Sequence, residues 1–318
     1  MAIIGVDISA AKAILEQGNL VAIPTETVYG LAGNAFNIDA VTKIFKTKNR
    51  PTFDPLIVHV DSFERLSEFT EELPEKAVQL TNAFWPGPLT ILLNKKAIIS
   101  DLVTAGLDTV AVRMPRHELT RELLNSLGFP LAAPSANPFG YISPTSAQHV
   151  QQQLGDKIEY ILDGGECGVG VESTIVSFED KLPKVLRLGG ISIEEIEQVI
   201  GKVEVNSHSS SQPQAPGMLK SHYAPKKKIL AIDNLDTEAN DLSAFGFLGF
   251  SKPDHRFKLE NQIVLSKNEN LNEAAKNLFG SLRTLDQNPK IHTIVVSFVP
   301  EMGLGRAIND RLRRATAK

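Results

Sequence analysis

The sequence predicts an α/β protein with two domains, a large one built on a mixed sheet and a smaller one after it. Helix-like and strand-like patterns alternate along the first two thirds of the 318 residues. Some links between the expected strands are too short for a helical crossover, so the sheet should contain antiparallel as well as parallel pairs. In the last third, short and nearly continuous apolar runs surround one strong helix stripe, which predicts a second, mostly parallel sheet.

The strands of the large domain are expected at short apolar runs that stop at proline or at polar residues. These runs are "LVAI" (20–23), "PLIVHV" (55–60), "WPGPLTILL" (85–93), "VAVRMP" (110–115), "PLAAPSAN" (130–137), "EYILDG" (159–164), "STIVSF" (173–178) and "KVLRL" (184–188). Helices are expected over 39–48 with Asp39 as N-cap, over 75–84, over 117–128, and after Ser192, whose partner Glu195 completes a capping box.

The chain changes composition at residues 206–228, "NSHSSSQPQAPGMLKSHYAPKKK", which have no apolar period and indicate a solvated linker. Beyond it, strands are expected at "KILAID" (228–233), "FGFLGF" (245–250), "QIVLS" (262–266) and "TIVVSFV" (293–299), with a helix over 271–285. The predicted organisation is therefore a large α/β domain (1–205), the linker (206–228) and a small α/β, Rossmann-like domain (229–318).

Composition excludes several classes of protein. The hydrophobic share of 42% and the charged share of 22% are those of a globular domain, and no apolar stretch approaches the roughly 20 residues that a membrane span needs. Cys167 is the only cysteine, which excludes an intrachain disulfide framework and, with the lack of a basic leader, favours a cytoplasmic location. The net charge of −4 argues against bulk coating of nucleic acid.

Polar and cationic residues collect where the expected strands end, the position at which open α/β sheets bind ligands. Three cationic positions, Lys48/Arg50, Arg113 and Arg187, predict an anionic ligand with many oxygens. The plainer alternative for Arg113 and Arg187 is structural ion pairing with Glu26 or Glu172. For Glu26 there are two alternatives: it orients Arg113 or another base, or it only caps the turn.

Familiar catalytic motifs are missing from the sequence. It contains no GxxxxGK[ST] phosphate loop, no GxGxxG opening a helix, no HExxH, no paired CxxC and no G-x-S-x-G elbow, and its histidines lack metal-ligand spacing. Any catalysis should therefore depend on positioning and on cationic stabilisation of charge rather than on a covalent nucleophile.

Taken in order, the clusters resemble the YrdC-like threonylcarbamoyl-adenylate synthases. The resemblance spans roughly residues 10–200 and is carried by "PTETVYGLAGNA", "KTKNRPTFDPLIVHV", "FWPGPLTILL", "VAVRMP", "PLAAPSAN", "GVESTIVSF" and "VLRLGG". The linker segment "APGMLKSHYAPK" and the small domain resemble the longer, two-domain branch. The resemblance implies a twisted, open mixed sheet with helices around a wide cavity.

It also implies a reaction, in which L-threonine, bicarbonate and ATP, with Mg²⁺, give L-threonylcarbamoyl-adenylate, pyrophosphate and water. A separate transfer complex would then use this product to modify tRNA. By resemblance, the catalytic residues are Lys48, Arg50, Ser135 and Asn137, and the ATP-binding residues are these four with Asp54, Thr109, Ser143, Arg187 and Tyr223. The L-threonine-binding residues are Thr27, His59, Arg113, Ala133, Ser135 and Ser173. The metal ligands stay unassigned.

Two features refine this expectation. Asp54 stands where family members commonly have asparagine, and a carboxylate there would repel phosphate unless magnesium or Lys48 offsets it; the alternative is that Asp54 caps a turn. The resemblance also gives the linker a second role, as an active-site lid with Tyr223 facing the nucleotide.

Two other functions compete with the synthase. One is a module that binds double-stranded RNA or tRNA, against which the net charge and the lack of interleaved aromatic and basic runs weigh. The other is a carbamoyl-adenylating enzyme with a different carbamoyl donor. Relatives of that kind carry acylphosphatase-like and zinc-finger segments, an architecture that one cysteine and no zinc spacing exclude.

Overall fold

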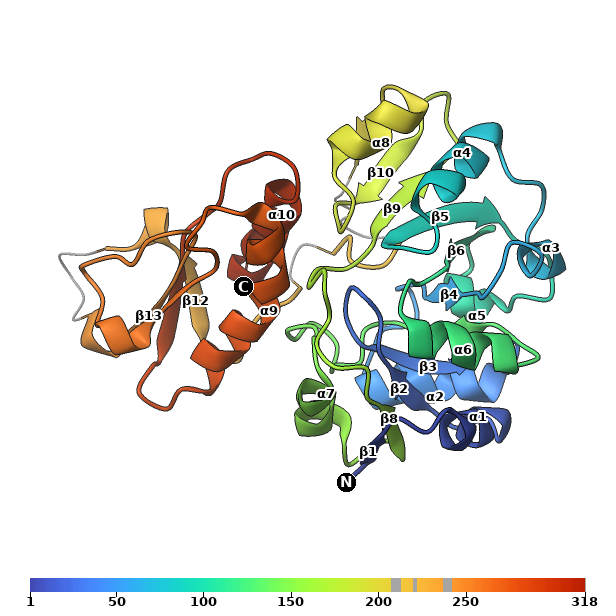
Figure 1. The fold of residues 1–318 in the computed structure, drawn as a ribbon, viewed down its shortest axis with the longest axis horizontal. Helices are drawn as coiled ribbons and strands as arrows, with labels where there is room; N and C mark the ends of the chain where they lie inside the picture. Colours follow the sequence, from blue (N-terminus) through green and yellow to red (C-terminus); the bar gives the residue numbers. More distant parts are fainter. Residues whose placement is uncertain (207–212, 220–221, 237–241, 318) are drawn as a thin grey trace.

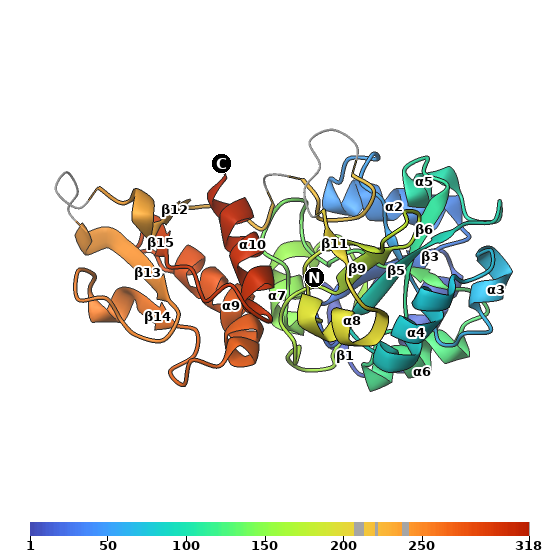
Figure 2. The ribbon, with the colours of Figure 1, turned by 90° about the horizontal axis from the view of Figure 1, so that it is seen from above.

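The computed structural model of the protein describes residues 1–206, 213–219, 222–236 and 242–317, and all structural statements concern these residues. Parts of the expected linker, 207–212 and 220–221, lie outside them. The described chain forms two α/β units, a large one from the N-terminal two thirds and a small one whose helices α9 and α10 face the large one (Figure 1; Figure 2).

The large unit contains an eleven-stranded mixed sheet, in the order β1-β8-β2-β3-β7-β4-β6-β5-β9-β10-β11. Its strands are β1 (Ile3–Gly5), β2 (Val21–Ile23), β3 (Gly30–Asn34), β4 (Ile57–His59), β5 (Leu89–Asn94), β6 (Thr109–Arg113), β7 (Leu131–Ala132), β8 (Tyr160–Leu162), β9 (Thr174–Ser177), β10 (Lys184–Arg187) and β11 (Glu204–Val205). The pairs β2–β3, β3–β7, β4–β7, β5–β6 and β9–β10 are antiparallel, whereas β4–β6 and β5–β9 are parallel. The predicted mixture of directions is therefore confirmed.

Helices surround this sheet, and their apolar stripes form its core. They are α1 (Ile8–Glu16), α2 (Ile38–Lys48), α3 (Leu66–Phe69), α4 (Glu75–Phe84), α5 (Asp101–Thr104), α6 (Glu118–Ser126), α7 (Ala147–Leu154) and α8 (Ile193–Ile200). The capping box of Ser192 and Glu195 is present as predicted. The N-cap predicted for α2 was wrong: Asn37, not Asp39, has the extended backbone of a cap, and its side chain accepts from the amides of Asp39 and Ala40.

The small unit has a four-stranded sheet in the order β12-β15-β13-β14, and all of its pairs are parallel, as predicted. Its strands are β12 (Lys228–Ala231), β13 (Phe245–Gly249), β14 (Gln262–Val264) and β15 (Thr293–Val296), with 3₁₀ turns η1 (Ile232–Asn234), η2 (Leu242–Ala244) and η3 (Leu259–Asn261). Helix α9 (Leu271–Gln287) contains the predicted stripe. Helix α10 (Gly305–Thr316) was not predicted.

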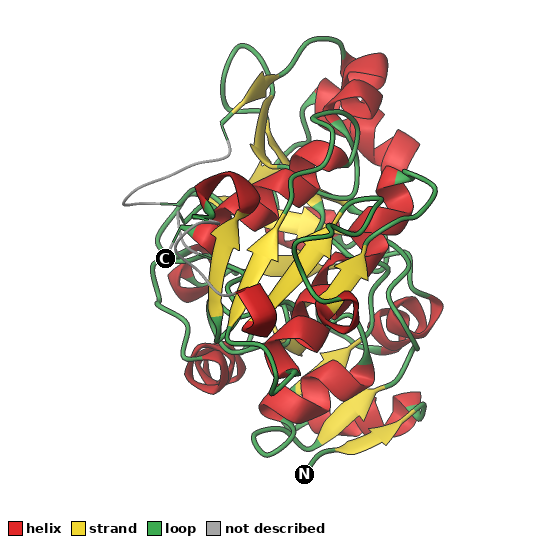
Figure 3. Cartoon of the chain, turned by 90° about the vertical axis from the view of Figure 1, so that its left-hand side faces the viewer, coloured by secondary structure: helices red, strands yellow, loops and turns green. Residues whose placement is uncertain are grey.

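One hydrophobic cluster belongs to both units. Val28, Ile142 and Val171 of the large unit lie in the same buried cluster as Tyr223, Phe279 and Leu312, among other residues of the small unit and of the segment leading to it. Figure 3, seen from the side of the small unit, shows the strands in yellow in the middle of the molecule with helices in red around them. The shared core fixes the small unit against the loops that follow the large sheet. No helix in the described residues has the length and apolar character needed to span a bilayer.

The position of the α2 cap can be tested by two substitutions. Asn37→Ala removes the side chain that satisfies two free amides, and we expect it to lower the free energy of unfolding by about 1 kcal/mol. Asp39→Ala removes only a favourable charge near the helix N-terminus, so its expected cost is about 0.3 kcal/mol. Urea unfolding of both variants and the wild type measures the difference, and a larger cost for Asp39→Ala would contradict the cap.

Candidate functional site

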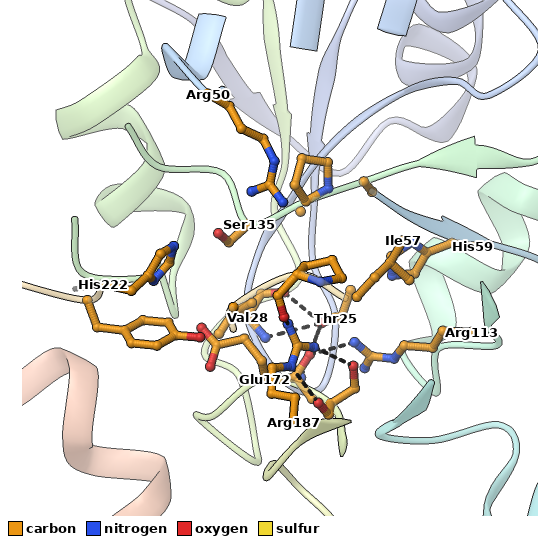
Figure 4. Close-up of a pocket in the computed structure, with 18 residues that line it drawn as sticks. Thr25, Val28, Arg50, Ile57, His59, Arg113, Ser135, Glu172, Arg187 and His222 are labelled. Carbon is orange, nitrogen blue, oxygen red and sulfur yellow. Dashed lines mark hydrogen bonds between the residues drawn. The ribbon is translucent and has the colours of Figure 1, made fainter. Parts of the chain in front are cut away.

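A pocket lies where the loops after several central strands meet (Figure 4). Of the residues predicted for the site, nine line it: Thr27, Arg50, His59, Arg113, Ala133, Ser135, Ser173, Arg187 and Tyr223. Glu172, Thr25, Val28, Gly30, Ile57, Pro134, Pro216, Gly217 and His222 complete the lining. Figure 4 shows Arg50, Arg113 and Arg187 approaching the pocket from different sides.

The loop between β2 and β3 forms one wall of this pocket. Strand β2 ends at Ile23, which pairs with Gly30 of β3, so residues 24–29 are a hairpin loop at the sheet end. Thr25 holds this loop, because its hydroxyl accepts from the amide of Val28 and lies 2.6 Å from the carbonyl oxygen of Val28, to which it donates. The loop therefore presents Thr27 in a fixed position, fully buried from solvent.

Arg113 ends β6 beside this loop and is held by groups from several segments. Its Nη1 donates to Thr27 Oγ1 at 2.9 Å, and its Nη2 forms an ion pair with Glu26 Oε1 at 2.7 Å. Glu26 Oε2 also accepts from the amide of Arg116. The ion pair considered as an alternative in the sequence thus exists, and Glu26 orients Arg113 while Arg113 still lines the pocket.

Arg187, at the end of β10, differs from Arg113 because its partners are uncharged. Its Nε and Nη2 donate to the carbonyl and the hydroxyl of Ser173, both at 2.9 Å, and its Nη1 donates to the carbonyl of Pro216 at 3.3 Å. Among the described residues, no carboxylate lies within ion-pairing distance of it, and burial lowers its pKa to about 10. A guanidinium that is buried without a counter-charge is suited to bind an anionic ligand.

Arg50 and Lys48 lie on the other side of the pocket. Arg50 donates to the carbonyls of Asp54 and Pro55 and forms an ion pair with the Asp54 carboxylate at 3.0 Å. Lys48 Nζ donates to the backbone carbonyls of Ser135 and Asn137, so it supports the loop that carries these two residues. Burial lowers the pKa of Lys48 well below its usual range.

Five predicted residues are not in the lining of the pocket: Lys48, Asp54, Thr109, Asn137 and Ser143. Asn137 donates to the carbonyls of Pro138 and Tyr141, and Ser143 donates to Glu172 Oε1 at 2.6 Å. Thr109 shares a face of β6 with Arg113 but starts that strand, roughly 13 Å away at the rise of a strand. The ATP contacts of these residues stay predictions.

Two histidines in the pocket are buried and uncharged. Burial, with the nearby charge of Arg113, lowers the pKa of His59 to about 3, and its Nδ1 has no hydrogen-bond partner among the described residues. Burial and the charges of Arg50 and Lys48 also lower the pKa of His222. Neutral imidazoles keep the pocket's positive charge on the arginines and leave ring nitrogens free for a polar ligand.

Residues 215–218 and 222–225 of the linker are buried against the rest of the protein rather than exposed to solvent. Ala215 and Met218 pack on the sheet face formed by Ile57, Ala111 and Leu186, and Pro216 and Gly217 line the pocket. Tyr223 is 1% exposed, its ring stacks on Phe279 of α9, and its φ of 65° is left-handed. A solvated spacer, the plain expectation from composition, is therefore wrong for these residues.

Sequence reasoning missed Arg311, which lies in the unpredicted helix α10. It is fully buried and forms an ion pair with Glu172 at 2.9 Å, 139 positions earlier in the chain. No local pattern signals such a pair, because both residues are charged positions that an exposed helix or a glycine loop would also contain.

The structure offers few groups for a protein-built metal site. Among the described residues, no group of three or more His, Cys, Asp or Glu side chains could hold a metal ion. Glu26, Asp54 and Glu172 are carboxylates at or beside the pocket, and each is paired with an arginine.

The pKa of His59 gives a testable pH dependence. Folded His59 stays neutral down to about pH 3, whereas in the unfolded chain it takes up a proton below about pH 6.5. The folded state therefore loses stability as the pH falls from about 6.5 toward 3, by about 2 kcal/mol at pH 5 for this group. His59→Gln should lose about 2 kcal/mol less than the wild type between pH 7.5 and pH 5 in urea unfolding. His255→Gln, at an exposed histidine, should follow the wild type, and equal losses in all three would contradict the shift.

Comparisons with known proteins agree with this geometry. The Sua5/YciO/YrdC family model, described as telomere recombination, matches residues 13–189, and a model described as the threonylcarbamoyl-AMP synthase C-terminal domain matches residues 191–317. Threonylcarbamoyl-AMP synthase of Pyrococcus abyssi is 41% identical over 97% of this chain and 94% of its own, and that of Bacillus subtilis is 41% identical over 97% and 92%.

A solved structure extends the likeness to three dimensions. The crystal structure of P. abyssi Sua5 complexed with L-threonine superposes with a TM-score of 0.90 at 40% identity, over 99% of this chain and 98% of that one. Both units are therefore matched together, in one arrangement. The chain belongs to the Sua5/YciO/YrdC family, in the two-domain form that carries a threonylcarbamoyl-AMP synthase C-terminal domain.

Proposed function

We propose that this protein makes L-threonylcarbamoyl-adenylate from L-threonine, bicarbonate and ATP, releasing pyrophosphate and water. It is a nucleotidyltransferase like its full-length relatives, which are named threonylcarbamoyl-AMP synthases. The observation that carries the proposal is the pocket with three arginines, of which Arg187 has no carboxylate partner among the described residues. A triphosphate and a carboxylate are the ligands that such a set of charges suits.

Two bond-forming steps account for the reaction. The threonine amine attacks bicarbonate and water leaves, which gives a carbamate. A carbamate oxygen then attacks the α-phosphorus of ATP, and pyrophosphate leaves with the electron pair of the broken P–O bond. Both steps need the reactants held close together and negative charge offset, which requires no covalent nucleophile from the protein.

The residues fit separate tasks in these steps. Arg113, fixed by Glu26 and Thr27, would bind the substrate carboxylate or carbamate with its planar fork. Thr27, Ser173, Ala133 and the neutral His59 would surround threonine. Arg187 and Arg50 would hold the phosphates, while Lys48 keeps the loop of Ser135 and Asn137 in place.

We further propose that Mg²⁺ enters with ATP rather than occupying a site made by the protein. Mg²⁺ in nucleotide sites is held largely by phosphate oxygens and water, with one or two carboxylates. Asp54, which pairs with Arg50 beside the pocket, would supply that carboxylate. The ion would neutralise the charge that develops on pyrophosphate.

The product would supply the threonylcarbamoyl group for N6-threonylcarbamoyladenosine in tRNA, through a separate transfer complex. We propose a cytoplasmic location for this step, since the tRNA substrates and the free nucleotide meet there. The need for a transfer complex rests on the chemistry of the product, a mixed anhydride that must meet an acceptor before water destroys it.

Pyrophosphate release from ATP tests the function directly. We expect release only when L-threonine and bicarbonate are both present. Arg187→Met should raise the KM for ATP by about 10-fold or more, because it removes the cation that has no carboxylate partner. The KM of Arg187→Lys should lie between those of the wild type and Arg187→Met, because lysine keeps the charge but not the planar fork. Release with carbamoyl phosphate in place of threonine and bicarbonate, or RNA binding without turnover, would refute the synthase and favour one of the two alternatives.

The linker supports a second prediction, that it closes the pocket over the adenylate. Pro216, Gly217, His222 and Tyr223 all line the pocket, and a Cβ on Gly217 would lie 2.9 Å from the Tyr223 hydroxyl. Tyr223→Ala should therefore increase the fraction of adenylate lost to solution and hydrolysed, measured as AMP formed per pyrophosphate. Tyr141→Phe, at a tyrosine outside the lining, is the control and should keep the wild-type ratio. An unchanged ratio of AMP to pyrophosphate in Tyr223→Ala would contradict the role of the linker as a lid.

A further inference from the structure

Arg311 is the most deeply buried charge at the junction of the two units. It is 0% exposed, although it belongs to a helix of the small unit. Its Nε pairs with Glu172 Oε2 at 2.9 Å, its Nη1 pairs with Asp310 Oδ2 at 2.7 Å, and its guanidinium lies 5.0 Å from the centre of the Tyr223 ring. Three groups thus fix one side chain, and a long side chain held in this way acts as a rigid part of the structure.

Glu172 is the partner that connects Arg311 to the site. It lines the pocket directly before Ser173, the residue to which Arg187 donates two hydrogen bonds. Its other oxygen accepts from Ser143 at 2.6 Å. Glu172 is therefore held away from Arg187, although its charge is close enough to act on the guanidinium of Arg187.

The arginine charges at the pocket pair off with carboxylates, with one exception among the described residues. Glu26 is balanced by Arg113, Asp54 by Arg50, and Glu172 by Arg311. Only Arg187 among these four cations has no carboxylate within ion-pairing distance in the described residues. Without Arg311, Glu172 would keep a negative charge that already acts on Arg187, the cation on which phosphate binding depends.

We propose that Arg311 is a positioning residue that holds Glu172 and so keeps Arg187 free for the phosphates of ATP. The proposal rests on the proposed function and deepens it, because it gives the small unit a task at the site. Removal of Arg311 frees a carboxylate that can pair with Arg187 and that also repels phosphate, so both effects weaken nucleotide binding.

The same helix also binds the two linker residues on either side of positions 220–221. Asp310 pairs with Arg314 at 3.0 Å, Arg314 Nη1 donates to the carbonyl of Leu219, and the carbonyl of Arg314 accepts from the amide of His222. Arg311 is thus built into a contact network that places Tyr223 and Glu172 together. A substitution at Arg311 can therefore act by charge or by loosening this network, and the experiment has to separate the two.

Titration calorimetry with ATP alone, on the full chain, separates them. Arg311→Met should weaken ATP binding by about 10-fold or more, and the double variant Glu172→Gln/Arg311→Met should restore it to within about 3-fold of the wild type. Glu172→Gln alone removes the carboxylate and should bind ATP at least as well as the wild type. Arg313→Met is the matched control on the same helix, because Arg313 is half exposed and, in the described part of the chain, contacts Glu301 and the Phe298 ring rather than any pocket residue. The affinity of this variant for ATP should equal that of the wild type.

The outcomes are distinct. If Glu172→Gln and the double variant bind ATP as poorly as Arg311→Met, the pair is merely structural and the proposal is overturned. If Arg311→Met fails to fold, shown by its thermal unfolding, Glu172→Gln decides: weakened ATP binding overturns the proposal and retained binding supports it. A wild type that binds ATP but releases no pyrophosphate with threonine and bicarbonate would refute the proposed function, while the order of ATP affinities would still test Arg311.

Discussion

The pocket depends on several buried guanidinium groups, of which all but one are neutralised by a carboxylate partner. Arg50, Arg113 and Arg311 each have a carboxylate partner within 3.0 Å, and such pairing offsets the cost of removing a charge from water. Within the described residues, the hydrogen-bond partners of Arg187 are carbonyls and a hydroxyl. Arg187 is shielded from bulk solvent but lines the pocket, where a ligand can reach it. The loops at the strand ends and the described linker residues form the walls around it.

The large unit alone does not complete that arrangement. Arg187 Nη1 is bonded to Pro216 of the linker, and Glu172 is paired with a helix of the small unit. The hydrophobic cluster that contains Tyr223, Phe279 and Leu312 holds these parts against Val28 and Val171. The site is therefore a property of both units, and the small one contributes by packing and by charge rather than by catalytic groups of its own.

Much of this could be predicted from the sequence, because the relevant signals are local. Apolar runs that stop at proline or at polar residues predicted β2, β4 and β7. Thr27 after β2, His59 in β4 and Ser135 after β7 do line one pocket. What could not be predicted depends on long-range contacts. The pairing of Glu172 with Arg311 joins two distant segments, and α10 carries so many charged residues that its buried face is hidden in the pattern. The α2 cap was misplaced because Asn37 and Asp39 are both good capping residues, and only the backbone conformation distinguishes them.

The linker shows why composition was misleading there. A segment rich in Ser, Pro, Gln and Lys cannot form its own core, but it can be held by the core of its neighbours. Tyr223 has a left-handed backbone, which is unfavourable for a tyrosine, and it is kept in that conformation by Phe279 behind its ring and by Arg311 over it. Gly217 has a φ of 83°, and any side chain there would meet both the Tyr223 hydroxyl and Arg187. The conformation of the pocket wall is thus enforced by the small unit, so a change in that unit's packing must reach Arg187 through the linker even when no pocket residue is altered.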